Sequence, residues 1–370
     1  MNLELTDEQT ALRDTVRHFL AEKASVAVHV RPLLDDSTGT TDEVWSGLAA
    51  LGATGVLVDE RHGGAGMTMV EAGIVAEQLG AALHPGPWLS SAVAAPRALT
   101  RFGAEDAGAL LAGLADGSTI AAVGPLTGPR PTAQRTADGV VVHGELAALP
   151  DAAAATVMLV LAEDADGAGL FTVDPASEEV TLTFRPQVDP TRKLFDVKLD
   201  AAPAQRIVRV SEDAVAGLVD DVLIANAADA LGAAQAVLDL TVEYAKVRKQ
   251  FGQPIGSFQA IQHLCVDMYE TVELARSGVL HALWAADSAS SEERHLAALR
   301  AKAFAGRLAT VGDTAIQVFG GIGFTWEHDA HLYVKRLLGW SAYLGGSDRY
   351  LEAVGAGLAS ESRNRDQEGN

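Results

Sequence analysis

Apolar residues at helical spacing mark the first third of the chain. Between Thr6 and Ala21, positions 11, 12, 16, 19 and 20 are apolar and fall on one helical face. Thr6 and Gln9 have the spacing of a capping box, which predicts that this helix begins just after Thr6. Similar patterns, separated by turn signals, recur at 42–51, 70–83, 88–102 and 106–115. We therefore predict a helical domain over residues 1–116.

The pattern changes near Ser118, where short β-prone runs replace the helical spacing. These runs are divided by Gly, Pro and Asp, which favour turns. They occupy 119–123, 139–143, 156–161, 170–173, 180–184 and 195–199. Short strands with frequent turns are typical of a barrel or a sandwich, so we predict a β domain over residues 117–209.

Helix formers return from Ser211 onward in long segments with few Gly or Pro residues. The segments cover 213–248, 258–286, 292–319, 328–338 and 347–358. Segments of this length can pack as a four-helix bundle with additional terminal helices, which we predict over residues 210–360. Residues 361–370 are polar apart from one Gly and are expected to form a frayed tail. The predicted fold class is a multidomain α+β protein.

Charge and composition narrow the function classes. The 370 residues include 28 Lys and Arg against 49 Asp and Glu, a formal net charge of -21. Such an acidic surface repels phosphate backbones and anionic lipids, so we expect neither a nucleic-acid nor a membrane partner. Cys265 is the single cysteine, and the chain has neither a Cys/His ligand cluster nor a signal-peptide pattern. We therefore expect a cytoplasmic protein without a metal site.

A first dense motif, EYAKVRKQFGQPIGSFQAIQ, lies at a predicted helix end over residues 243–262. A cation, an amide and an aromatic ring, Arg248, Gln250 and Phe251, precede a turn through Gly252 and Pro254. Such a corner can bind phosphate by a charge-assisted hydrogen bond and stack a flat heterocycle on the ring. The alternative is a plain helix C-terminus, where the Arg complements the helix dipole and the Phe packs in the core.

A second motif, AIQVFGGIGFTWEHD, lies over residues 315–329. Gln317 ends a predicted helix, and the adjacent Gly320 and Gly321 would let backbone amides approach a dinucleotide closely. The alternative is a glycine C-cap at Gly320. The motif is not a Rossmann fingerprint, because it follows a helix and lacks the GxGxxG spacing.

In this order and on this domain plan, the two motifs resemble the flavin-dependent acyl-CoA dehydrogenase family. The glycine-rich segment 59–66 and the segment 189–193 support the resemblance, which covers nearly the whole chain. It implies FAD as cofactor and α,β-dehydrogenation of a fatty or steroid acyl-CoA. It also implies cofactor-binding residues that hold the ADP half of a FAD belonging chiefly to the neighbouring subunit. These residues are Arg248, Gln250, Phe251, Gln317, Gly320 and Gly321.

The chain departs from the family pattern where a catalytic base is required. The reaction needs a carboxylate to take the α-proton while hydride leaves the β-carbon. Relatives place it in a loop near the C-terminus or near the start of the first long C-terminal helix, and these positions hold Leu344 and Val222 here. Neither side chain accepts a proton. Leu223 replaces an Arg that often orients the substrate, and the usual flavin-ring segments are missing at 124–130 and 148–152.

The losses are selective, because groups lent to a neighbour's FAD remain while those for the chain's own flavin ring and base are missing. In this the chain resembles the base-lacking subunit of heterotetrameric actinobacterial acyl-CoA dehydrogenases, which share one FAD site per heterodimer. The implied partners are a paralogous subunit, an acyl-CoA substrate, and electron-transfer flavoprotein or a similar acceptor.

Two alternatives stay open. A self-sufficient homo-oligomer would need a relocated base, for which Asp220, Asp221, Glu327 and Asp348 are candidates, although such charged residues are expected to be solvated. A non-enzymatic scaffold could keep the fold for interaction or acyl binding, but it would have no use for Arg248 and Gln317.

Overall fold

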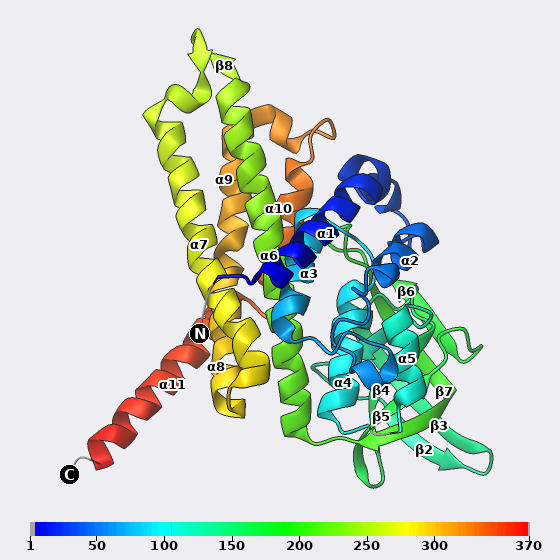
Figure 1. The fold of residues 1–370 in the computed structure, drawn as a ribbon. Helices are drawn as coiled ribbons and strands as arrows, with labels where there is room; N and C mark the ends of the chain where they lie inside the picture. Colours follow the sequence, from blue (N-terminus) through cyan, green and yellow to red (C-terminus); the bar gives the residue numbers. More distant parts are fainter. Residues whose placement is uncertain (1–3, 105, 369–370) are drawn as a thin grey trace.

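The N-terminal unit is helical, as the computed structural model shows; the structure describes residues 4–104 and 106–368 of the chain. Its helices are α1 (Asp7–Lys23), α2 (Asp42–Ala50), α3 (Met69–Ala81), α4 (Ala95–Arg101) and α5 (Gly108–Asp116), and the short helical segment η4 (Leu89–Ala94) leads directly into α4. Thr6 and Gln9 form the predicted capping box at the start of α1. Figure 1 shows α3 beside the long helix α6 and α5 against the β strands.

The middle unit is a β barrel. Its strands are β1 (Ala121–Gly124), β2 (Thr132–Thr136), β3 (Gly139–Pro150), β4 (Val157–Asp164), β5 (Gly167–Val173), β6 (Val180–Phe184) and β7 (Leu194–Arg209). Strands β2, β3, β7, β5 and β4 pair in turn, and β4 meets β2 again through Thr132 and Glu163, which closes the ring. The sequence did not predict β2, because only Ala133 of that strand is buried and no apolar alternation results.

The C-terminal unit is the predicted helical bundle. It comprises α6 (Glu212–Val247), a small hairpin of β8 (Lys249–Gln250) and β9 (Gln253–Pro254), then α7 (Gln259–Ser288), α8 (Ser291–Ala305), α9 (Ala309–Phe319), η7 (Gly320–Phe324), α10 (Ala330–Ala342) and α11 (Ser347–Glu368). Among the described residues, no helix combines the length and apolar character needed to cross a membrane.

Two boundaries of the bundle differ from the sequence prediction. The segment 292–319 is not one helix, since it breaks at Gly306, where an added Cβ would lie 2.8 Å from the Ser347 Cβ. Glycine therefore allows the start of α11 to approach closely. The backbone stays helical to Glu368 instead of fraying from residue 361, and α11 extends away from the bundle in Figure 1. Good helix formers such as Glu, Arg and Gln favour this extension. Gly369 and Asn370 lie outside the described residues.

The hydrophobic cores connect the three units. Helices of the first and last units share one large core, and the close approach of α3 to α6 depends on glycine. A Cβ added at Gly232 would lie 1.8 Å from the Glu77 carbonyl oxygen, and one at Gly80 would lie 1.9 Å from that of Asp229. The barrel has its own core, and a further cluster that includes Leu159 and Val222 joins it to both helical units. The three units therefore meet at a tightly packed junction.

Candidate functional site

Six residues singled out from the two motifs lie at one end of the bundle. Arg248 caps α6, Gln250 and Phe251 belong to the β8–β9 hairpin, Gln317 lies in the last turn of α9, and Gly320 and Gly321 begin η7. A small apolar cluster of Ala245, Ile255 and Val318 holds these segments together, and the Tyr244 and Phe319 ring centroids are 4.8 Å apart. The structure thus brings both motifs to the end of the bundle that Figure 1 shows away from the barrel.

All six residues are exposed to solvent. The Phe251 side chain is 94% exposed with φ at 51°, so the alternative in which this ring packs in the core is wrong. The Arg248 guanidinium forms no ion pair with any residue that the structure describes. Gly320 ends α9 with a φ of 65°, in keeping with a glycine cap. At Gly321 an added Cβ would meet nothing within 4 Å, so packing within the chain does not require a glycine there.

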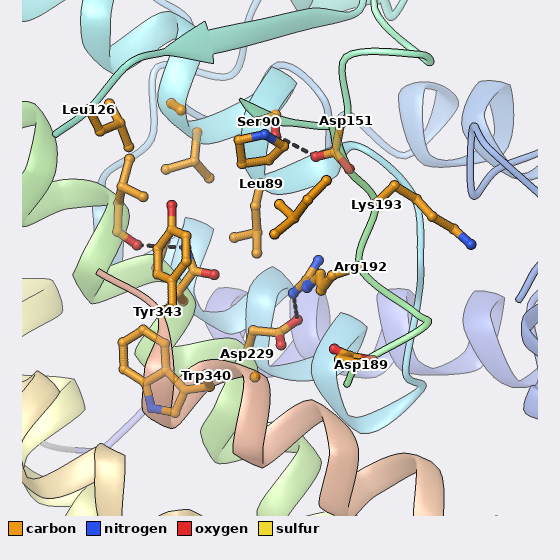
Figure 2. Close-up of a pocket in the computed structure, with 18 of the residues that line it drawn as sticks. Leu89, Ser90, Leu126, Asp151, Asp189, Arg192, Lys193, Asp229, Trp340 and Tyr343 are labelled. Atoms are coloured by element: carbon orange, nitrogen blue, oxygen red, sulfur yellow. Dashed lines mark hydrogen bonds and ion pairs between the residues drawn. The ribbon is translucent and has the colours of Figure 1, made fainter. Parts of the chain in front are cut away.

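A narrow cavity lies at the junction of the three units. It is lined by η4, the barrel segments 123–126 and 150–151, the loop 187–194, and helices α6 and α10. Figure 2 shows Leu89, Ser90, Leu126, Trp340 and Tyr343 around it. A larger surface groove lies alongside, and Val123, Leu126 and Tyr343 line both spaces.

The two positions expected to hold a base lie at these spaces. Val222 lines the cavity from α6 and is 5% exposed, while Leu344 lines the groove in the α10–α11 loop with a φ of 55°. The Tyr350 hydroxyl donates a hydrogen bond to the Leu344 carbonyl at 2.8 Å, which fixes the loop. The junction therefore presents two alkyl groups at the positions where the sequence led us to expect a proton acceptor.

The four carboxylates considered as replacements do not line the cavity or the groove. Asp220 and Asp221 are buried rather than solvated, so that expectation was wrong for them. Asp220 lies 2.9 Å from His295 Nδ1, and this hydrogen bond raises the pKa of the imidazole. Asp221 pairs with Arg97 at 2.7 Å and also with Arg101. Glu327 and Asp348 are exposed.

A buried ionic network forms one wall of the cavity. Arg336 is 2% exposed and pairs with Asp229 at 3.0 Å and with Asp189 at 3.1 Å. Arg192 pairs with the same Asp229 at 2.7 Å. These side chains come from the barrel, α6 and α10, so the network ties two units together. Asp189 and Arg192 belong to the segment 189–193 that the sequence singled out.

Asp151, which the sequence analysis did not nominate, lines the same cavity. It follows β3 with a φ of 58°, is 5% exposed and accepts a hydrogen bond from the Ser90 hydroxyl. Burial raises the pKa of its carboxyl to about 6. The sequence could have indicated Asp151 through its place in segment 148–152, where a flavin-ring segment was expected.

Comparison with known proteins assigns the chain to a family. The profile for the acyl-CoA dehydrogenase C-terminal domain matches residues 223–359, and the profile for the acyl-CoA dehydrogenase N-terminal domain matches residues 6–118. The chain belongs to the acyl-CoA dehydrogenase family, an oxidoreductase family that acts on CH–CH bonds.

One curated relative and two solved structures are particularly informative. Acyl-CoA dehydrogenase FadE34 of Mycobacterium tuberculosis is 37% identical over 95% of this chain, but the chain spans only 48% of FadE34. The Tcur3481-Tcur3483 steroid ACAD is 29% identical with a TM-score of 0.86, over 96% of this chain and 99% of that one. The ChsE4-ChsE5 complex from Mycobacterium tuberculosis is 27% identical with a TM-score of 0.86, over 97% and 99%.

Proposed function

We propose that this chain is the base-lacking subunit of an FAD-dependent acyl-CoA dehydrogenase, and that it pairs with a paralogous chain in an α2β2 complex. The substrate class is a fatty or steroid side-chain acyl-CoA. One observation supports the proposal: the residues expected to bind the dinucleotide face solvent at the bundle end, while the two positions expected to hold the base carry the alkyl groups of Val222 and Leu344.

The residues at the bundle end fit the ADP half of FAD. Arg248 offers a guanidinium without an ion-pair partner in the described chain, suited to a pyrophosphate oxygen. Phe251 offers an exposed ring for stacking, and Gly321 leaves space for close approach of a ligand to the backbone. When bound, FAD accepts the hydride from the acyl β-carbon. The side chains of this chain would position the dinucleotide, and the proton would pass to a carboxylate of the partner.

The size of one relative, FadE34, supports a two-chain unit. This chain matches about half of FadE34, and the unmatched half has about the length of one further such chain. Both solved relatives at 27% and 29% identity bear paired names, ChsE4-ChsE5 and Tcur3481-Tcur3483, and the second is called a steroid ACAD. A paralogue carrying the missing carboxylate is the partner that these likenesses favour, with electron-transfer flavoprotein or a similar protein as electron acceptor.

Helix α7 offers such a partner a face on which large apolar side chains lie beside the exposed carboxylate of Glu270. Val266, Tyr269 and Leu274 on α7 are 59%, 57% and 61% exposed. Large apolar groups that gather on one helix cost solvation unless another surface covers them. We place the subunit contact on this face, which continues toward the hairpin that carries Phe251.

Partner-free turnover tests the proposal directly. The purified chain, supplied with FAD and an acyl-CoA, is expected to show no ferricenium-coupled dehydrogenation, because no carboxylate occupies position 222 or 344. The same assay on the chain co-expressed with a paralogue that has a Glu at one of these positions is expected to show turnover. Turnover by the isolated chain would contradict the proposal.

A second candidate is a self-sufficient homo-oligomer, and Asp151 is the observation that favours it. Among the carboxylates that line the cavity, Asp189 and Asp229 are ion-paired, whereas Asp151 has only a Ser90 hydrogen bond. In this case the isolated chain would turn over acyl-CoA, Asp151→Asn would abolish turnover, and Asp348→Asn would leave it unchanged.

A further inference from the structure

The junction cavity has two unlike ends. Its apolar part, shared with the neighbouring groove, includes Val123, Leu126 and Tyr343. The charged residues Asp151, Asp189, Arg192, Asp229 and Arg336 line the cavity but not the groove. A molecule that passes from the groove into the cavity would meet these apolar groups and Gln187 before it reaches the charged residues.

Most of the charged end is already occupied by internal contacts. The Arg336 guanidinium contacts Asp229 and Asp189, and it donates at 3.0 Å to the Thr191 hydroxyl and to the His84 carbonyl. Lys193 points away from the cavity in Figure 2, where its ammonium donates to the carbonyls of Leu33 and Leu34 at 2.8 and 2.7 Å. Contacts within the chain therefore already engage most of the donors of these two side chains.

Arg192 and Asp151 retain unused hydrogen-bonding capacity, as does the Asp189 carboxyl, whose Oδ2 contacts Arg336 without good hydrogen-bond geometry. Arg192 has one ion pair, to Asp229, and its guanidinium makes no side-chain hydrogen bond of good geometry with any residue that the structure describes. Asp151 uses one carboxylate oxygen for Ser90, and the described chain supplies no donor for the other. Figure 2 shows Asp151 above and Arg192 below the charged end of the cavity. A donor and an acceptor thus remain available on two sides of one small space.

The charge pattern selects the group that fits between them. A ligand carboxylate would be repelled by Asp151, Asp189 and Asp229, and a ligand ammonium by Arg192 and Arg336. A hydroxyl can donate to a carboxylate and accept from a guanidinium at once. Both buried groups would then gain the partner whose absence costs free energy.

We propose that this cavity binds an acyl group whose remote end carries a hydroxyl, which donates to Asp151 and accepts from Arg192. The choice of an acyl thioester as the ligand rests on the proposed acyl-CoA dehydrogenase function. In this cavity, Asp151 recognises the substrate and takes no part in proton transfer.

Two thioesters of equal length test this inference by calorimetry on the full chain in the complex that it forms. 12-Hydroxydodecanoyl-CoA is expected to bind about tenfold more tightly than dodecanoyl-CoA, because a hydrogen bond to a charged group is stronger than one between neutral groups. In Asp151→Ala this preference should fall to about twofold or less, with dodecanoyl-CoA affinity unchanged. Asp348→Ala, at an exposed carboxylate, serves as the matched control.

Asp151→Asn provides a second test if the alanine variant fails to fold, because Asn tolerates a left-handed backbone. It removes the charge, and the preference should fall to about threefold. Equal wild-type affinity for the two thioesters, an undiminished preference in the Asp151 variants, or no binding of either thioester would each overturn the inference. These readouts are independent of flavin content and turnover, so the proposed function can fail or hold separately.

Discussion

The end of the bundle and the three-unit junction carry functional groups in opposite states. At the bundle end, Arg248 and Phe251 face solvent, and nothing in the described chain pairs with that guanidinium. At the junction, Arg336 and Asp229 are buried and paired with each other, and Val222 and Leu344 are apolar. The bundle end offers unused contacts to the outside, whereas at the junction Arg336 and Asp229 are paired within the chain and only groups such as Asp151 keep unused capacity.

On the proposed function, this difference separates the paired junction charges, which stabilise the fold, from the unpaired bundle-end groups, which are expected to bind the cofactor. Packing and ion pairing account for the charges at the junction, because each of Arg336, Asp229 and Asp189 has a partner there. Neither packing nor pairing accounts for an exposed phenylalanine with a positive φ. Variants of the two regions should therefore affect different measurements, with stability changing at the junction and cofactor binding changing at the bundle end.

Asp229→Asn is expected to give the largest effect. It leaves Arg192 without an ion-pair partner and Arg336 with Asp189 alone, so that one buried positive charge is uncompensated, which should lower the free energy of unfolding by about 3–5 kcal/mol. Urea unfolding of this variant beside the exposed Asp348→Asn measures the difference. A loss below about 1 kcal/mol, the range of a surface pair, would contradict a structural role for the network.

Asp151→Asn should stabilise the protein in a pH-dependent way. Burial raises the pKa of the folded-state carboxyl from 3.8 to about 6, so the ionised form lowers stability above pH 6 and this cost disappears below pH 3.8. The free energy of unfolding of the variant should therefore exceed that of wild type by up to about 3 kcal/mol at pH 8 and by far less near pH 4. Urea unfolding at the two pH values measures this, and an equal difference at both would show that ionisation of Asp151 is not responsible.

Arg248→Ala should lower FAD affinity of the assembled complex about ten- to hundredfold, because a charge-assisted hydrogen bond contributes about 1.5–3 kcal/mol. Its free energy of unfolding should change by less than about 1 kcal/mol, as for other exposed charges. Lys249→Ala, which removes the neighbouring exposed cation, is the control. The complex with this variant should retain more FAD after dialysis than the complex with Arg248→Ala. Equal flavin retention in both variants would leave Arg248 as a helix-terminal cation only.

Phe251→Gly should give the smallest change. Loss of one stacking contact, about 0.5–1.5 kcal/mol, should weaken FAD binding roughly two- to tenfold. Stability should stay within about 1 kcal/mol of wild type, because glycine adopts the positive φ without strain and no core contact is lost. Flavin fluorescence titration and urea unfolding give the two values. A clear loss of stability with unchanged FAD affinity would reassign the ring to packing.

The sequence predicted elements well where one apolar face decides the structure. Strand β6 spans residues 180–184 as predicted, and α6 differs from its predicted range by one residue at each end. Strand β2 was not predicted because it buries only Ala133. The break at Gly306 lies where the chain contacts Ser347, 41 residues later. Long-range contacts of this kind leave no local pattern.

The candidate site could be predicted only in part, because some of its residues stand in local motifs whereas others are placed by long-range contacts. The bundle-end residues stand in two short motifs, so their grouping could be inferred before the structure. Asp220 and Asp221 resemble ordinary surface carboxylates in sequence, and only the approach of Arg97, Arg101 and His295 reveals that they are buried and paired. Asp151 has no sequence pattern of its own, since the cavity that it lines is assembled from all three units.

Flavin stoichiometry of the co-expressed complex tests the central claim most directly. The chain is purified with a candidate paralogue that has an intact flavin-ring segment and a Glu at one of the two base positions. Native mass and absorbance should give a heterotetramer with one FAD per pair of unlike chains. A stable homotetramer of this chain alone with one FAD per chain would contradict the account.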